Sequence, residues 1–99
     1  MIARHWRGLV KRDRADAYVE HLQSETLPQL VQLVGFLDAK VLRRDLPQGV
    51  EFLVVTIWDS LDAIRAFAGK DVESAVVPPK ARDMMLEYDR TSRHYEVVD

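Results

Sequence analysis

The sequence predicts an α+β domain in which a four-stranded antiparallel sheet carries two helices on one face. Two windows rich in β-branched and aromatic residues, 36–46 and 50–58, flank the breaker Pro-Gln-Gly and are expected to form a hairpin. Two further windows have apolar residues at helical spacing, and each follows a β-rich window. β-rich windows also begin and end the chain, at 2–10 and 87–98. The predicted order is therefore β-α-β-β-α-β.

Length and composition limit the chain to one domain. Its 99 residues are 47% apolar and 30% charged, values that are typical of a globular protein. A chain of this length buries only about 60–65% of its unfolded surface, which leaves no material for a second core. No stretch has the low hydrophobicity of a disordered tail. We therefore expect residues 1–99 to fold as a single domain.

The first strand is expected over residues 2–10, where β-formers occur on both sides of the chain. Successive side chains of a strand point to opposite faces, so this strand divides its polar residues between the two faces. One face receives Arg4, Trp6, Gly8 and Val10, and the other receives Ala3, His5, Arg7 and Leu9.

The first helix is expected to begin at Arg14, with Asp13 as its N-cap. A proline in a helix interior removes a hydrogen bond, so Pro28 predicts a break. Thr26 would cap a second helical piece, with Pro28 in its first turn and Gly35 at its end. The apolar positions that indicate this helix are Ala15, Tyr18, Val19 and Leu22.

The second helix follows the hairpin directly. Its expected cap is Ser60 or Asp59, and its expected end is Gly69. In residues 70–89 two adjacent prolines interrupt any long helix, so we expect an irregular connection with short helical turns at most. Residues 87–98 then form the fourth strand. The apolar stripe of the second helix consists of Leu61, Ile64, Phe67 and Ala68.

This element order is the ferredoxin-like plan, in which both helices cover the same face of the sheet. The other face would remain uncovered, although the strand 50–58 carries apolar residues on both of its sides. A chain of 99 residues has no second layer for that face. We therefore expect a homodimer, in which a second copy of the sheet covers the first.

Composition also excludes several classes of protein. The chain lacks cysteine, which excludes disulfides and Cys-based zinc sites and is compatible with a reducing compartment. Its formal net charge of −2 argues against a nucleic-acid-binding protein. Arg4, His5 and Arg7 interrupt the first apolar stretch, which is unlike a signal peptide. No segment approaches the ~20 apolar residues of a membrane helix. We expect a cytoplasmic protein without a nucleic-acid or membrane partner.

Three segments carry a resemblance to a known family: IARHWRG (2–8), EFLVVTIWDSLDAIRAFAG (51–69) and HYEVV (94–98). Together they resemble the antibiotic biosynthesis monooxygenase (ABM) family of the dimeric α+β barrel superfamily. The resemblance implies a barrel formed by two sheets across a dimer, with a pocket in each subunit between its helices and its sheet. It also implies one of two activities: oxidation of polycyclic phenols to quinones without a prosthetic group or metal, or binding and degradation of haem.

The resemblance to the haem-degrading members can be tested by position. Those members have an Asn on the first strand, a Trp on the second helix and an axial His shortly after that helix. The corresponding places fall near His5 or Trp6, near Phe67, and near Val76 or Val77. Because the axial ligand is missing, we do not expect haem degradation by that route, with His21 or His94 left as an alternative ligand. The chain also lacks a GxGxxG pattern, so we expect neither haem nor flavin as a cofactor.

The cofactor-free members imply a site in which a base removes a phenolic proton and the resulting anion reduces oxygen in a dry pocket. Such chemistry needs a base with a pKa near neutral pH, a donor for the developing anion, and apolar walls. His94 and His5 are the candidate bases, because the first and fourth strands are neighbours in this topology. The candidates for holding the anion are Arg4, Arg7 and Tyr95, and the candidates for the walls are Trp6, Trp58 and Phe67.

These residues also have structural interpretations. Trp58 ends a buried strand, where an indole fills a core or a dimer interface. His94 could instead hold a carboxylate such as Glu96, and His21 lies beside the apolar stripe of the first helix, where a histidine is usually partly exposed. No two histidines have the i, i+4 spacing of a helical metal site, so we do not expect a bound metal ion.

Three functions stay open on the sequence alone. The favoured one is a cofactor-independent monooxygenase that acts on a small aromatic or phenolic substrate, with His94 as its base. The second is a non-catalytic dimeric module that binds a small hydrophobic ligand, and the third is a haem-binding protein. Convergence of Trp6, Trp58 and His94 on one cavity would favour the first function, and separate packing would favour the second.

Overall fold

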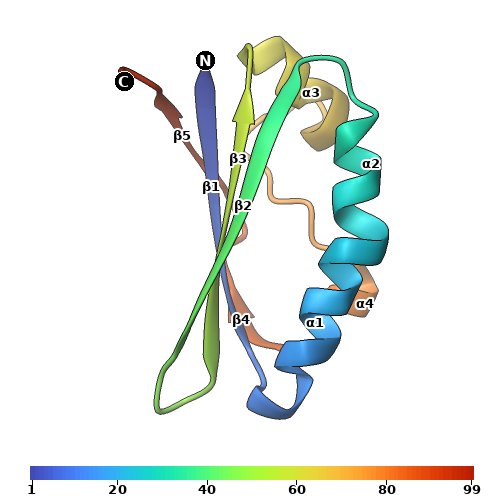
Figure 1. Cartoon of the computed structure of the whole chain (residues 1–99), viewed down its shortest axis with the longest axis vertical. Helices are drawn as coiled ribbons and strands as arrows, with labels where there is room; N and C mark the ends of the chain where they lie inside the picture. Colours follow the sequence, from blue (N-terminus) through green and yellow to red (C-terminus); the bar gives the residue numbers. More distant parts are fainter.

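The computed structural model describes all 99 residues as two layers, a sheet and a set of helices on one of its faces (Figure 1). The strands run in the order β2-β3-β1-β4, with β5 also paired to β1, and every pairing is antiparallel. This confirms the predicted α+β class and the ferredoxin-like strand order. The strands are β1 (Ile2–Val10), β2 (Phe36–Asp45), β3 (Val50–Trp58), β4 (Met85–Tyr88) and β5 (Arg93–Glu96).

The sheet has five strands where four were predicted, because the last strand is interrupted. On β1, two residues (Trp6 and Arg7) lie between those that pair with β4 and those that pair with β5. Between β4 and β5 themselves the chain has four residues, Asp89–Ser92, over the same distance. Asp89 N–H still donates to Arg7 O at 2.9 Å, but the residues after it leave β1 and meet the connection after α3, where Ser92 N–H donates to Glu73 O at 2.7 Å. This bulge brings Ser92 beside the inner face of the sheet.

The helical layer consists of short segments: η1 (Arg12–Arg14), α1 (Ala15–His21), η2 (Leu22–Thr26), α2 (Leu27–Val31), α3 (Leu61–Ala68) and α4 (Pro79–Arg82). The prediction of a break at Thr26 was wrong, because α1, η2 and α2 form one continuous helix. Segment η2 is a π-helical turn, in which Leu27 N–H donates to the carbonyl of Leu22. The wider turn accommodates Pro28, whose ring would clash with the carbonyl four residues before it in a regular α-helix.

The predicted caps had mixed outcomes. Ser60 caps α3, since its hydroxyl accepts a hydrogen bond from Ala63 N–H at 3.2 Å, and Gly69 ends that helix with a positive φ of 88°. Asp13 does not cap α1, because it lies inside η1. Thr26 caps nothing either, because its own backbone is helical.

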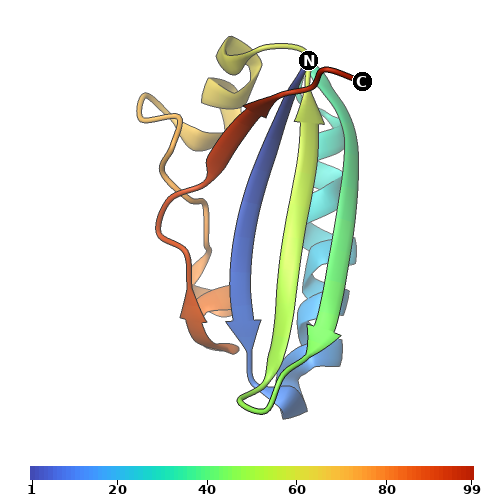
Figure 2. The same ribbon diagram turned by 90° about the vertical axis from the view of Figure 1, so that its left-hand side faces the viewer.

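The connection that was expected to be irregular contains both α4 and β4. Helix α4 begins at the second of the two prolines, where a missing N–H costs no hydrogen bond. Lys11 N–H donates to Met84 O, so the end of this connection is tied to the end of β1. The segment between α3 and α4 runs along one side of the molecule, as Figure 2 shows.

The core consists of two clusters of buried side chains between the sheet and the helices. The larger cluster lies beneath α1 and α4 and includes Val10, Tyr18, Leu22, Phe52 and Ala81. The smaller cluster lies beneath α2 and α3 and consists of Leu30, Trp58 and Ile64. The space between these clusters holds the candidate site described below.

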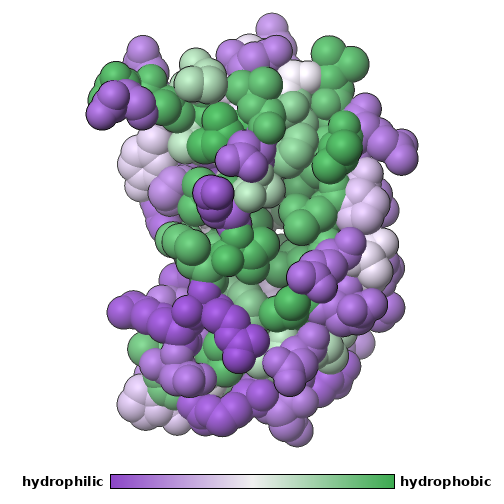
Figure 3. Space-filling view, viewed as in Figure 1, coloured by the Kyte–Doolittle hydropathy of each residue, from purple (hydrophilic) through white to green (hydrophobic).

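The opposite face of the sheet carries no helix (Figure 2). The strand register places Leu42, Leu53, Val55 and Ile57 on this uncovered face, next to His5 and Arg7. In the view of Figure 3, hydrophobic residues gather over the upper and middle parts of the molecule, and hydrophilic residues cover its lower part. No helix has the length and hydrophobicity that a membrane-spanning helix needs.

Candidate functional site

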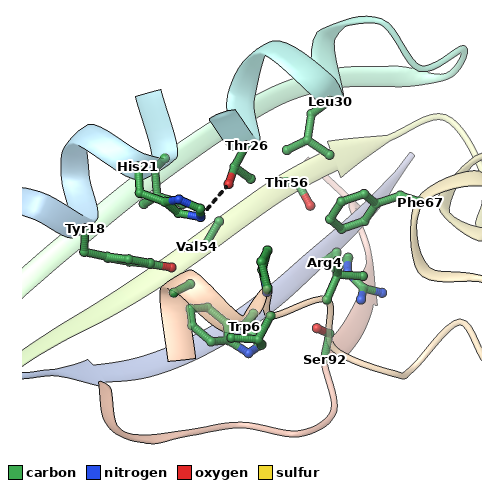
Figure 4. Close-up of a pocket in the computed structure, with 15 residues that line it drawn as sticks. Arg4, Trp6, Tyr18, His21, Thr26, Leu30, Val54, Thr56, Phe67 and Ser92 are labelled. Carbon is green, nitrogen blue, oxygen red and sulfur yellow. Dashed lines mark hydrogen bonds between the residues drawn. The ribbon is translucent and has the colours of Figure 1, made fainter. Parts of the chain in front are cut away.

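A cavity of about 60 Å³ lies between the inner face of the sheet and the helices (Figure 4). It adjoins both core clusters, because Tyr18 and Leu22 of the larger cluster and Leu30 of the smaller one line it. Its floor comes from β1 and β3: Arg4, Trp6, Val54 and Thr56. Its roof comes from the helices: Tyr18, His21, Leu22, Thr26, Leu30 and Phe67. The remaining wall consists of Val76, Val77, Pro78, Ala81 and Ser92.

Trp6 lies along the floor of the cavity because Gly8 leaves room for its ring. A Cβ at Gly8 would lie 2.5 Å from the indole of Trp6, closer than real Cβ atoms approach a neighbour. The indole Nε1–H donates to Asp89 O at 2.8 Å, which anchors the polar edge of the ring to the bulge between β4 and β5. The sequence Trp-Arg-Gly therefore places an aromatic wall against the sheet.

Arg4 lies at one end of the cavity and is only 4% exposed. Its guanidinium donates to Val72 O at 2.5 Å and to Ser74 O at 2.8 Å, which ties the connection after α3 to the sheet. No carboxylate lies within ion-pair distance of it, although eight other ion pairs occur in the structure. Burial lowers the pKa of Arg4 from its ordinary value. The cavity therefore ends at a buried cation without a countercharge.

His94 lies behind Arg4 and does not line the cavity. Its Nε2 is 2.8 Å from Arg4 Nη1 and accepts the hydrogen bond, since a guanidinium only donates. Burial and the neighbouring charge of Arg4 lower the pKa of His94. The lone pair of Nε2 is thus already used, and the imidazole serves to position Arg4.

Ser92 contributes an unpaired hydroxyl beside Arg4. The residue is 2% exposed, and its Oγ is buried without a hydrogen-bond partner. A buried polar group without a partner costs free energy, so such groups are rare and frequently belong to binding sites. Arg4 and Ser92 together form a polar end of the cavity that suits an anionic or strongly polar oxygen.

His21 lines the opposite end of the cavity and is only 4% exposed, whereas a partly exposed position was expected for it. Its ring stacks near that of Tyr18, with centroids 6.2 Å apart. Its Nδ1 lies 3.2 Å from Glu25 Oε2, and the same carboxylate oxygen accepts from Lys80 Nζ at 2.8 Å. Burial raises the pKa of Tyr18, whose hydroxyl therefore stays protonated.

The sequence contained two signals for His21. It is three residues after Tyr18, so both lie on the same side of a helix, and Glu25 follows it at the i, i+4 spacing of a helical pair. Neither signal shows that the apolar stripe faces a cavity instead of a filled core. That distinction depends on side chains from β1, β3 and the segment before α4.

The other predicted site residues are divided between three environments. Phe67 and Trp6 line the cavity, and the Phe67 ring lies 5.9 Å from the guanidinium carbon of Arg4. Trp58 is fully buried in the smaller core cluster, where its Nε1–H donates to Thr56 Oγ1 at 2.8 Å. His5, Arg7 and Tyr95 lie on the uncovered face of the sheet.

His5 and His94 therefore do not face the same pocket. In the pairing of β1 with β5, His94 is opposite Arg4 and His5 is opposite Arg93, so the two histidines project from opposite faces. The ring of His5 packs edge-on against Tyr95, with centroids 5.0 Å apart. Burial, followed by the charge of Arg93, lowers the pKa of His5.

No group of three or more metal-ligating side chains occurs. Val76 and Val77, at the place of the axial histidine, line the cavity with apolar side chains. His94 Nε2 already accepts a hydrogen bond from Arg4 at 2.8 Å, whereas His21 has its Nδ1 at 3.2 Å from Glu25 and its Nε2 near only Thr26. The cavity therefore presents valines where the haem-degrading members have their axial histidine.

The model of the antibiotic biosynthesis monooxygenase family matches residues 1–76. A search of curated proteins gave no match. Among solved structures, a candidate antibiotic biosynthesis monooxygenase from Bacillus cereus superposes with a TM-score of 0.68 at 22% identity, covering 100% of this chain and 93% of that chain.

Two further solved structures contain bound molecules. A variant of MhuD with two manganese protoporphyrin IX molecules per active site has a TM-score of 0.69 at 21% identity, covering 99% of this chain and 95% of that one. A Streptomyces coelicolor monooxygenase in complex with nanaomycin D has a TM-score of 0.58 at 14% identity, covering 95% of this chain and 82% of that one. At these identities the likenesses establish a common fold.

Proposed function

Because this chain belongs to the antibiotic biosynthesis monooxygenase family, we propose that it is a cofactor-independent monooxygenase that oxidises a small phenolic compound in the cavity beneath its helices. One observation carries the proposal. The cavity has aromatic walls and ends at a buried guanidinium that lacks a carboxylate partner, beside a hydroxyl that also lacks a partner. An electron-rich aromatic anion supplies what these groups lack.

The proposed reaction needs no external reductant. A phenol such as 1-naphthol and one O₂ give a quinone and water: one oxygen atom enters the ring, and the substrate supplies all the electrons that reduce the other atom. Arg4 and Ser92 would stabilise negative charge on the oxygen molecule as it accepts electrons from the substrate, and Trp6 and Phe67 would hold the ring. The apolar walls exclude water, which strengthens the attraction between Arg4 and the anion.

The test is oxygen uptake by the purified protein with a panel of naphthols and hydroquinones, combined with mass spectrometry of quinone formed under ¹⁸O₂. We expect one labelled oxygen atom in each quinone made from 1-naphthol. The matched pair of variants is Arg4→Met and Arg7→Met, which remove the same group from opposite faces of β1. We expect turnover to be lost in the first and kept in the second. No uptake with any member of the panel would contradict the proposal.

A second candidate function is a binding module for a small hydrophobic ligand. It is supported by the separation of Trp6, Trp58 and His94, of which only Trp6 lines the cavity, and by the largely apolar lining. Saturable quenching of Trp6 fluorescence by naphthols without oxygen uptake would favour this function. Trp58→Phe provides the matching background, because it removes the indole that lies in the core.

Haem binding is not proposed, because valines occupy the place of the axial histidine. We expect purified protein to lack an absorption band near the haem Soret position and to gain none when haem is added. A band at near-stoichiometric occupancy would contradict this expectation.

We also propose that the protein forms a homodimer through the uncovered face of the sheet. Leu42, Leu53 and Tyr95 on that face are apolar or aromatic, and Leu42 and Tyr95 are about half exposed. Sedimentation at micromolar concentration tests this. A single 11.4 kDa species in the wild type would contradict the dimer, and Leu42→Asp should shift an existing dimer toward that monomer mass. We further propose a cytoplasmic location, for which the lack of cysteine is the support.

A further inference from the structure

We propose that His21, oriented by Glu25, is the general base that removes the phenolic proton in this cavity. The inference rests on the proposed function and replaces His94 in that role. Of the three histidines in the chain, only His21 lines the cavity. Figure 4 shows its ring directed into the cavity from the helical roof, at the end away from Arg4 and Ser92.

The π-helical turn of η2 assembles the groups around His21. The wider turn brings the residues four and five positions after His21 onto the same side of the helix. Glu25 then lies against one ring nitrogen, with Oε2 at 3.2 Å from Nδ1. Thr26 lies near the other, with Oγ1 at 3.5 Å from Nε2, a distance too long for a strong hydrogen bond. Nε2 is therefore the nitrogen with an available lone pair.

Glu25 determines which ring nitrogen carries the proton in neutral His21. A carboxylate only accepts hydrogen bonds, so Nδ1 must be the protonated nitrogen and Nε2 the unprotonated one. Hydrogen bonds from Lys80 and then from His21 hold the pKa of Glu25 below its usual value, which keeps it ionised. Its negative charge also stabilises the imidazolium that forms after proton transfer.

The proton transfer needs no further reactant. The phenolic O–H bond breaks, a new N–H bond forms at Nε2, and the electron pair stays on the substrate oxygen. The charged and titratable groups around the imidazole are Tyr18 from α1, Glu25 from η2 and Lys80 from α4, with Arg4 facing it across the cavity. Tyr18 stays protonated and does not compete as the base. The proton on Nε2 then leaves with the reduced oxygen atom as water, which restores neutral His21 with its proton on Nδ1, facing Glu25.

The first experiment measures ionisation without turnover. 4-Nitrophenol is titrated into the protein between pH 5 and 8, and the visible absorption of its phenolate reports how much of the bound phenol is ionised. We expect His21→Gln to bind the probe as tightly at high pH but to lower the ionisation constant of the bound phenol by about tenfold. His5→Gln, on the uncovered face, is the matched control and should behave as the wild type. Equal ionisation in His21→Gln and wild type would overturn the proposal.

The second experiment measures turnover of the naphthol that the wild type oxidises best. We expect His21→Gln to lower kcat by roughly 10²–10⁴-fold, the usual effect of losing a general base. Its remaining activity should rise with pH in parallel with ionisation of the free phenol. A loss that does not recover at high pH would overturn the proposal. Absence of turnover in the wild type would contradict the proposed function, while the 4-nitrophenol result would still decide the role of His21.

If His21→Gln does not fold, Glu25→Gln takes its place in both experiments. Glu25 is at the surface, and the amide keeps its shape but loses the charge that orients the imidazole. We expect bound 4-nitrophenol to be less ionised than in the wild type, whereas Lys80→Met keeps the carboxylate, removes a positive charge beside the imidazolium and should not lower the ionisation. Wild-type ionisation of the probe in Glu25→Gln would contradict the assigned role of Glu25.

Discussion

Arg4 and Arg7 lie three positions apart on β1, yet their environments are opposite. Arg7 projects from the uncovered face, where it donates to Glu51 at 2.5 Å and to Glu87 at 3.4 Å, and these carboxylates raise its pKa. Arg4 projects under the helices, where it meets two backbone carbonyls and an imidazole but no carboxylate, and burial lowers its pKa.

The difference teaches how to recognise a binding site from charge. A compensated arginine at the surface is part of an ion-pair network and contributes little to stability. A buried arginine without a countercharge is unfavourable unless its environment or a ligand offsets the desolvation. The inner face of β1 therefore carries a candidate anion site, and its uncovered face carries a surface network of ion pairs. Four predictions test this difference between the two faces.

The largest effect is expected from truncating an aromatic residue on each face. Trp58→Ala removes a fully buried indole and should lower the free energy of unfolding by about 3–5 kcal/mol. Tyr95→Ala removes a side chain that is 49% exposed in the single chain, so at concentrations too low for the proposed dimer it should cost less than about 1 kcal/mol. Urea denaturation measures both. A loss of several kcal/mol in Tyr95→Ala at such low concentrations would contradict the contrast between the two faces.

The second effect compares the two arginines directly. Arg4→Met leaves the carbonyls of Val72 and Ser74 without a donor, so we expect a loss of about 2–3 kcal/mol in the free energy of unfolding. Arg7→Met should cost less than about 1 kcal/mol, because its partners stay hydrated. Equal losses in the two variants would remove the contrast between the faces.

The third effect concerns the room that Gly8 provides for Trp6. Gly8→Ala would bring Cβ against the indole, forcing the ring toward the cavity at a cost of about 1–2 kcal/mol. We expect weaker quenching of Trp6 fluorescence by naphthols, because the displaced ring occupies their space. Unchanged stability and unchanged quenching would show that the indole of Trp6 can move without entering the cavity.

The smallest effect concerns pH. The pKa values of His94 and His5 are both lowered in the folded state. At pH values between these lowered pKa values and the ordinary histidine pKa of 6.5, the unfolded state therefore binds more protons than the folded state. Stability should therefore be complete above pH 6.5 and fall as the pH drops toward 5. Thermal melts should show a decrease of a few degrees, reduced in His94→Gln and in His5→Gln. A melting temperature that rises on acidification would reverse the sign.

Features that depend on local chemistry were predictable from the sequence. The three long strands, the Ser60 cap and the Gly69 terminus follow from residue type and spacing, and the structure confirms them. The alternation of β1 was also predictable, so Arg4 and Trp6 were assigned to one face and His5 and Arg7 to the other. The break at Thr26 was wrong because a π-helical turn satisfied Pro28 in a way that residue spacing does not indicate.

The sequence by itself determined the order of the elements and which residues of β1 share a face, because a strand's alternation and a helix's periodicity are local properties of the chain. Only the tertiary structure decided which face became the cavity and which histidine entered it. The three partners of Arg4 lie 68, 70 and 90 residues away in the chain, and His21 is placed opposite them by the packing of α1 and η2 on the sheet. Contacts at such separations depend on how the layers pack, and no local pattern encodes them.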